Sequence, residues 1–155
     1  DPHEALAICD RVAVLRSGEI QQYSTPLEMV ANPSNDFVGQ FVLQKNILPI
    51  QYINNSYSTC IGSLNLSFDS SISSKSVCMF DKNAIRIEPS INDIFTVVSK
   101  EYRINHYVYT IISDDLKLRS EMSLETPLSI GDKCKVESIP GKSFLVLPEK
   151  IKSNF

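Results

Sequence analysis

The sequence is poor in several features that mark particular classes of protein. It contains no tryptophan and only five glycines. No run of about 18 apolar residues is present, so we expect no segment that inserts into a membrane. The first residues also lack the basic and apolar regions of a secretory signal. There is no GxxxxGK[ST] loop to hold phosphates and no apolar strand ending in an acidic pair to hold magnesium. We therefore predict that this chain neither binds nor hydrolyses ATP.

The few cysteines and histidines argue against a metal site. No Cys-x-x-Cys pair occurs, and the two histidines, His3 and His106, are far apart in the sequence. Structural zinc sites need such ligands at close spacing, so we predict no metal ligands. We expect the thiols to be free and buried, in a reducing cytoplasm. The four cysteines are Cys9, Cys60, Cys78 and Cys134.

The N-terminal residues carry signals for a short helix followed by a hairpin. Pro2 suits a first helical turn, and the apolar residues after it have helical spacing. Residues 11–15 alternate as a half-buried strand does, the pair Ser17-Gly18 supplies the positive φ of a tight turn, and residues 19–23 return. The apolar positions of the predicted helix are Ala5, Leu6, Ile8 and Cys9.

Two further helices are predicted before residue 43. Thr25 and Glu28 form a capping box with Pro26 at the first helical position, and Asn32-Pro33 ends that helix. Asn35-Asp36 can cap a last short helix. Its apolar positions, at helical spacing, are Phe37, Val38, Phe41 and Val42.

This first third of the chain resembles the end of the nucleotide-binding domain of an ABC transporter ATP-binding subunit. The resemblance implies a carboxy-terminal piece of an importer ATPase, with residues 1–42 as the remnant of that domain. Asp1 would follow the family's switch histidine, and His3 falls at a variable position. ATP and magnesium are implied for the intact subunit, and no cofactor for this piece. The matching positions are Glu4, Ala5, Leu6, Asp10, Arg11, Val12, Val14, Leu15, Gly18, Ile20, Gln22, Thr25, Pro26, Glu28, Pro33, Phe37, Val38, Phe41 and Asn46.

From residue 47 the apolar period changes to two, which predicts a mainly β fold, an OB-like barrel or sandwich. The serine-rich stretch 69–75 is predicted to be a loop within this part. The predicted strands are 47–52, 57–61, 64–68, 76–80, 84–88, 93–103, 106–113, 116–122, 133–139 and 143–147.

Residues 43–155 resemble the transport-associated OB domain that follows importer ATPases. Three motifs occur in the expected order: residues 80–87, 109–118, and 131–136 with 145–148. Two positions depart from the family pattern. Asp81-Lys82 replaces an Arg-Pro pair, and the usual hairpin glycine is missing from 103–107. These departures weaken any transfer of ligand contacts from the family.

Charged and polar residues gather around one predicted hairpin: Glu101, Arg103, His106, Asp114 and Asp115. Paired carboxylates can act as acid and base when their pKa values differ. Aspartates also favour turns for conformational reasons, so we predict no catalytic residues here. His106 is a candidate for a pH-responsive contact, against the simpler expectation of a partly exposed strand histidine.

Three tyrosines alternate near the same hairpin. Tyr102, Tyr107 and Tyr109, with Arg103, could stack bases as OB folds do. Such residues equally suit packing on a strand. The net charge of −3 and the pI near 5.4 argue against a nucleic-acid partner.

The resemblance implies a regulatory extension that keeps two ATPase subunits together. Its expected partners are a second copy of the subunit and the membrane permease, which places it on the cytoplasmic face of the membrane. The segment Phe41–Pro49 is similar to the corresponding segment of iron(III) importer ATPases. Importers of polyamines, molybdate, sulfate or sugars share much of this segment. The alternative is a stand-alone OB-type module that binds RNA or a small oxyanion.

Overall fold

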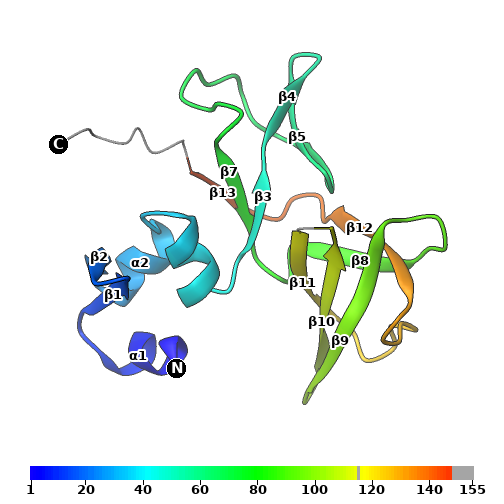
Figure 1. The fold of residues 1–155 in the computed structure, drawn as a ribbon, viewed down its shortest axis with the longest axis horizontal. Helices are drawn as coiled ribbons and strands as arrows, with labels where there is room; N and C mark the ends of the chain where they lie inside the picture. Colours follow the sequence, from blue (N-terminus) through cyan, green and yellow to red (C-terminus); the bar gives the residue numbers. More distant parts are fainter. Residues whose placement is uncertain (115, 148–155) are drawn as a thin grey trace.

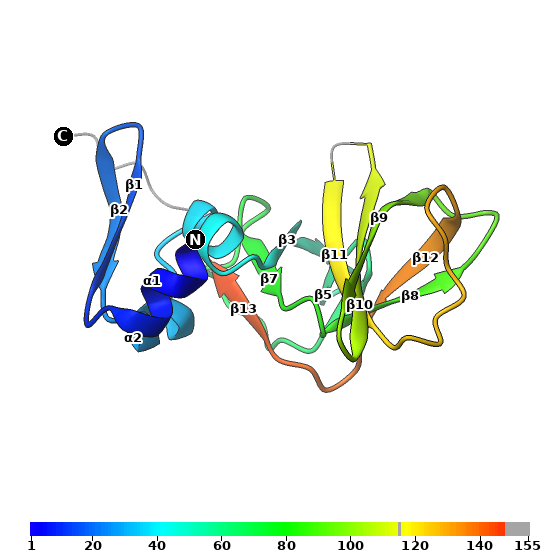
Figure 2. The same ribbon diagram turned by 90° about the horizontal axis from the view of Figure 1, so that it is seen from below.

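A computed structural model describes residues 1–114 and 116–147 (Figure 1). Asp115 and Pro148, which belong to motifs discussed above, lie outside the described residues. Within the described part the chain is mainly β, with short helical segments only near the N-terminus, as the sequence predicted. The N-terminal helices and hairpin lie at one end of the molecule, and the large five-stranded sheet lies at the other, in both views of the ribbon (Figures 1 and 2).

The N-terminal segment, which precedes β3 (Asn46–Pro49) and comprises residues 1–45, forms the predicted helices and hairpin. Ser17 and Gly18 both have positive φ, at 53° and 84°, which is the backbone of a two-residue hairpin turn. The capping box also forms. The Thr25 hydroxyl accepts from the Glu28 N–H at 3.3 Å, and Glu28 Oε2 accepts from the Thr25 N–H at 3.0 Å. The elements are α1 (Pro2–Ile8), β1 (Val12–Arg16), β2 (Glu19–Ser24) and α2 (Pro26–Ala31).

The last predicted helix is wound as a π-helix, η1 (Val38–Val42). Asn35 and Asp36 do accept backbone hydrogen bonds, from the N–H groups of Val38 at 2.9 Å and of Phe37 at 2.8 Å. The wider winding shows in the bond from the Leu43 N–H to the Val38 carbonyl, at 3.3 Å. Sequence spacing could not distinguish this π-turn from an α-helix.

The rest of the described chain, residues 46–114 and 116–147, is called the β part and contains three sheets. The largest has the order β11-β10-β9-β12-β8, and two three-stranded sheets have the orders β13-β7-β3 and β4-β5-β6. The strands are β3 (Asn46–Pro49), β4 (Gln51–Ile53), β5 (Ser56–Thr59), β6 (Gly62–Leu64), β7 (Val77–Phe80), β8 (Ile85–Pro89), β9 (Phe95–Arg103), β10 (His106–Ser113), β11 (Leu116–Met122), β12 (Lys133–Ser138) and β13 (Phe144–Leu147).

The large sheet curls until its outer strands meet. The Ser120 hydroxyl of β11 donates to the Ile85 carbonyl of β8 at 2.9 Å. The Glu121 N–H donates to the Lys82 carbonyl, just before β8, at 2.8 Å. These bonds cover the two edges of the sheet, as the closure of a barrel does.

Two strand predictions were wrong in detail. The predicted strand 47–52 divides at Ile50, because β3 pairs with β7 in one sheet and β4 pairs with β5 in another. The alternating run 64–68 stops at Leu64, and Phe68 is 72% exposed beside Tyr52. Gly62 begins β6 with a φ of 139° instead of ending a strand. Alternation alone does not reveal whether a partner strand is present.

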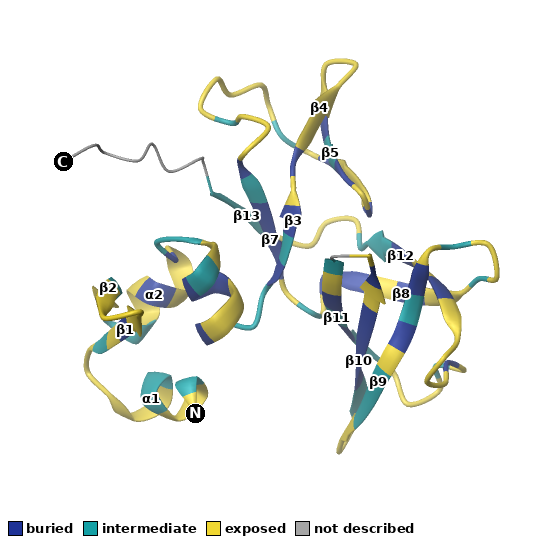
Figure 3. Ribbon diagram, in the orientation of Figure 1, coloured by how far each residue is buried: buried dark blue, intermediate teal, exposed yellow. Residues whose placement is uncertain are grey.

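The buried apolar residues form two separate clusters. The larger lies inside the β part and has 18 buried members, from Leu48 to Val136. The smaller consists of Val14, Met29, Val38 and Val42. Figure 3 shows how much of the N-terminal segment is exposed by comparison. The boundary between residues 42 and 43 stays a prediction, although the two clusters fall on either side of it.

The β9–β10 turn contains an unfavourable residue. Ile104 has a φ of 39° and is 87% exposed, and the left-handed region costs a β-branched residue about 1–2 kcal/mol. We predict that Ile104→Gly raises the free energy of unfolding by about 1 kcal/mol in urea denaturation, because glycine has no such penalty. Ile91→Gly is the matched control: Ile91 is 91% exposed without a positive φ, so this change should lower stability. A loss of stability in Ile104→Gly would contradict the prediction.

Candidate functional site

The charged residues of the predicted hairpin do not form one group. Glu101 Oε2 lies 2.7 Å from an Arg103 amino group, and His106 Nε2 lies 3.8 Å from Glu121 Oε2. Asp114 directly follows β10, whose two ends, His106 and Ser113, are roughly 24 Å apart at about 3.4 Å per residue. Asp115 lies outside the described residues. The structure therefore does not bring Asp114 to the other candidates, and the absence of catalytic residues stays a prediction.

The three tyrosines pack on one another along β9 and β10. The Tyr102–Tyr107 and Tyr107–Tyr109 ring centroids are 6.0 and 5.9 Å apart. The Lys100 ammonium lies 4.3 Å from the Tyr107 centroid and donates to the Leu128 carbonyl at 2.9 Å. Tyr109 is fully buried. Only Tyr102 is largely exposed, at 65%, so the three rings do not form an open platform for stacking bases.

Two of the four cysteines differ from expectation. Cys78 and Cys134 are buried and free, as predicted, and burial raises their pKa values to about 12 and about 11. Cys9 and Cys60 are exposed. Cys9 ends helix α1, which has no buried residue, and Cys60 lies in the turn between β5 and β6. Within 1–114 and 116–147 no group of three or more His, Cys, Asp or Glu side chains is placed to hold a metal ion. The absence of metal ligands stays a prediction.

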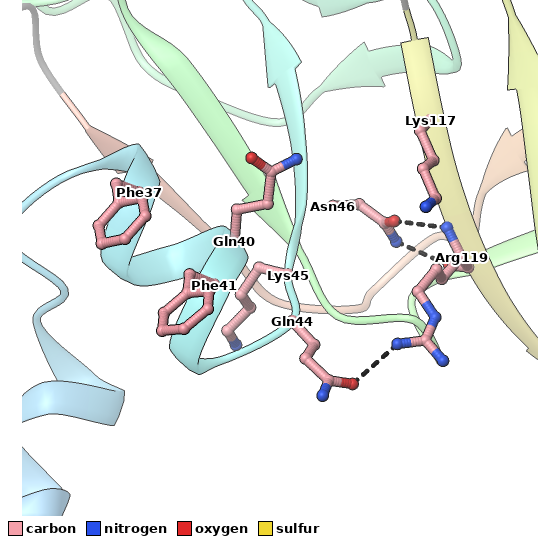
Figure 4. A pocket seen from close by; sticks show the side chains of 8 residues that line it. All are labelled: Phe37, Gln40, Phe41, Gln44, Lys45, Asn46, Lys117 and Arg119. Carbon is pink, nitrogen blue, oxygen red and sulfur yellow. Dashed lines mark hydrogen bonds between the residues drawn. The ribbon is translucent and has the colours of Figure 1, made fainter. Parts of the chain in front are cut away.

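A buried asparagine joins the end of the N-terminal segment to the large sheet. Asn46 begins β3 and is only 3% exposed. Its amide donates to the Arg119 carbonyl at 2.8 Å, and its Oδ1 accepts from the Arg119 N–H at 2.7 Å. Both polar ends of one buried side chain are thus satisfied by the backbone of β11 (Figure 4).

The Arg119 side chain extends the same junction. One amino group donates to Gln44 Oε1 at 2.8 Å, and the other lies 3.4 Å from Glu101 Oε1. The Nε atom is buried without a hydrogen-bond partner among the described residues. Gln44 itself has a φ of 52°, where the chain leaves η1 and turns into β3.

Two more contacts hold η1 against the β part. The Lys45 ammonium lies 2.8 Å from Asp81 Oδ1, and the Lys45 N–H donates to the Gly39 carbonyl at 3.0 Å. Gly39 is packed so closely that an added Cβ would lie 2.6 Å from Met79 Sδ. Any larger residue at 39 would displace Met79 or the helix.

A pocket of about 410 Å³ lies over this junction (Figure 4). A volume of this size is typical of small-molecule sites. Its walls come from the end of the N-terminal segment and from β11. The lining residues are Phe37, Gln40, Phe41, Gln44, Lys45, Asn46, Lys117 and Arg119. We call it the junction pocket, and it is a candidate small-molecule site in the described part of the chain.

The junction pocket was not predicted from the sequence. Alternation along β11 places Lys117 and Arg119 on the face opposite the buried Leu118 and Ser120. That pattern identifies the solvent-facing side of β11. It does not reveal that Asn46, 73 residues earlier in the chain, is hydrogen-bonded to the same strand. The only local signal was a polar residue, the last of Gln44-Lys45-Asn46, directly before the apolar residues 47–49.

Comparison with known proteins gives local matches only. No family model matches the chain. It is 40% identical over 53 residues to the Fe(3+) ions import ATP-binding protein FbpC of Rhizobium etli, which is 34% of this chain and 15% of that protein. It is 45% identical over 49 residues to the spermidine/putrescine import ATP-binding protein PotA of Pseudomonas fluorescens, which is 32% of this chain and 13% of that protein. The osmoprotectant import ATP-binding protein OsmV of Salmonella typhimurium is 50% identical over 48 residues, 31% of this chain and 13% of that protein.

These matches support the coarser part of the resemblance found in the sequence. About a third of this chain is homologous to the ATP-binding subunits of ABC importers. The chain spans only 13 to 15% of the length of these relatives. Their names cover an inorganic ion, polyamines and osmoprotectants, so the similarity does not single out iron.

The Asn46 junction gives a direct test of the structure. Asn46→Ala leaves the part-buried N–H and carbonyl of Arg119 without these partners, so the free energy of unfolding should fall by about 2–4 kcal/mol. Urea denaturation measures the change. Asn92→Ala, at an exposed turn position, is the matched control and should stay within about 0.5 kcal/mol of the parent protein. Equal effects of the two changes would show that the Asn46 bonds contribute little.

Proposed function

We propose that this chain is the C-terminal regulatory part of the ATP-binding subunit of an ABC importer. In this proposal residues 1–42 complete the nucleotide-binding domain, and residues 43–155 form an OB-like domain that holds two subunits together. The local homology to importer ATP-binding proteins carries the proposal. The order of the parts supports it, because the β part follows the helices and the hairpin.

The exposed surface of the N-terminal segment also supports the proposal. Ile8, Leu27 and Ile20 are 83%, 80% and 65% exposed. Leaving three such side chains in water forgoes about 1.5–3 kcal/mol each relative to full burial. A segment of this kind is expected where further protein covers it, and the remainder of a nucleotide-binding domain would do so.

Under the proposal, ATP chemistry belongs to the longer subunit. The 155 residues contain no GxxxxGK[ST] loop, and ATP with magnesium would bind elsewhere in the parent protein. The described helices include none with the length and apolarity needed to cross a bilayer. We place the subunit at the cytoplasmic face of the membrane, in contact with its permease.

For the transported substrate we propose iron(III), because the segment from Phe41 to Pro49 resembles the corresponding segment of iron(III) importer ATPases. One of the similar proteins is named for Fe(3+) import. Polyamines, sulfate, molybdate and sugars are the alternatives. The cargo itself would be handled by the permease and a separate binding protein.

For the contact between two subunits we propose the outer side of β9 and β10. The exposed apolar side chains Ile94, Val98 and Ile112 lie around the Thr96–Ile112 strand pair and are 65%, 40% and 39% exposed. A row of this kind suits a two-fold contact between identical surfaces.

The regulatory role can be tested in the intact subunit, assembled with its permease and iron-loaded binding protein. Deleting residues 47–155 should lower the ATPase rate by on the order of tenfold, because the two subunits lose the link that keeps them at high effective concentration. The same assay with spermidine-loaded binding protein in place of the iron-loaded one tests the cargo. An unchanged rate after the deletion would contradict the regulatory role.

Sedimentation of this chain provides the second readout. We expect a concentration-dependent dimer that Ile94→Asp weakens at least about tenfold, because the change buries a charge in an apolar contact. Ile20→Asp is the matched control, since Ile20 is also 65% exposed but lies on the N-terminal hairpin. A strict monomer at high concentration, or dissociation by Ile20→Asp alone, would contradict the proposed contact.

A further inference from the structure

The junction pocket has polar groups with no protein partner. Among residues 1–114 and 116–147, nothing pairs with the Lys117 ammonium or with the Gln40 side-chain amide. Both line the pocket, from opposite walls (Figure 4). Lys117 is exposed on β11 and Gln40 is exposed on η1. The pocket therefore offers one unpaired positive charge and one free amide for a ligand.

The other two cations that line the pocket already have ion-pair partners. Lys45 is paired with Asp81 at 2.8 Å, and Arg119 with Glu101 at 3.4 Å. No carboxylate lines the pocket itself. The unpaired cation facing a ligand is therefore Lys117. Arg119 adds positive charge, because it shares the Glu101 carboxylate with Arg103, and an anionic group at Lys117 is favoured by both.

The pocket also has an apolar wall. The rings of Phe37 and Phe41 stack at a centroid distance of 5.2 Å and within 6° of parallel. Phe41 remains 57% exposed. An apolar wall with a few polar groups that orient the ligand is the usual construction of a small-molecule site.

We propose that the junction pocket binds a small organic carboxylate, with its anionic group at Lys117 and Gln40 and its apolar body toward Phe41. A bare inorganic oxyanion is disfavoured, because it would leave the apolar wall at Phe41, which is 57% exposed, in contact with water. Arg119 is held by Gln44 and Glu101 and gives the wall a fixed shape, so little ordering is needed on binding. The proposal does not depend on the importer assignment.

Benzoate is the probe, in an NMR titration of the full 155-residue chain. We expect saturable shifts at the amides of the lining residues, with a Kd on the order of 1 mM, as suits a ligand of this size. Benzamide has the same shape without the charge and should bind at least about tenfold more weakly. Acetate and sulfate supply the charge without the ring and should also be weaker than benzoate.

Lys117→Gln identifies the recognition group. This change should weaken benzoate about tenfold or more, since a charge-assisted bond is lost. Lys133→Gln is the matched control, because Lys133 is also an exposed strand lysine but lies on β12, outside the pocket. The proposal is overturned if benzoate gives no saturable shift at these residues. It is equally overturned if benzamide or sulfate binds as tightly as benzoate, or if Lys117→Gln and Lys133→Gln weaken benzoate binding by the same factor.

Discussion

The arrangement of this protein depends on the paired hydrogen bonds between the Asn46 side chain and the Arg119 backbone. Asn46 is the first residue of β3 and is nearly fully buried. A buried amide is stable only if both of its ends are bonded, and β11 provides one acceptor and one donor at 2.8 and 2.7 Å. This requirement determines where the chain enters the β part, and it places η1 beside β11 so that a pocket forms between them.

The two apolar clusters on either side of this junction are unequal. The β part buries 18 apolar residues in one cluster, whereas the N-terminal cluster has four. A unit with so few buried side chains gains little from folding compared with the entropy it loses. The N-terminal segment therefore relies on local devices, such as its capping box and tight turn, and on its attachment to the β part. A segment that is locally well formed but poorly covered fits a piece of a larger domain, as proposed.

Sequence reasoning succeeded where local chemistry decides the structure. The Ser17-Gly18 turn and the Thr25–Glu28 capping box follow from conformational preference and from hydrogen bonds within four residues. The long strands β9 and β10 follow from alternation sustained over 9 and 8 residues. These features, with the change from helical period to period two, were enough to predict a mainly β fold.

The errors in the sequence-based predictions lie where contacts between segments distant in the chain determine the structure. The division of 47–52 at Ile50 depends on which strands pair on each side. The exposure of Cys9 depends on what covers the end of α1, and no described segment buries Cys9 there. The junction pocket required the pairing of Asn46 with a strand 73 residues away. Neither periodicity nor motif spacing contains such long-range information.

The central claim is that a self-contained β domain carries a segment that is stable only with further cover. Amide hydrogen exchange of the 155-residue chain tests this claim most directly. The account predicts slow exchange, near the limit of global unfolding, for the central strand β10, and exchange faster by at least about a hundredfold for the hydrogen-bonded amides of β1, β2 and α2. Equal protection in the two parts would contradict it, because the small N-terminal cluster would then be as stable as the β core.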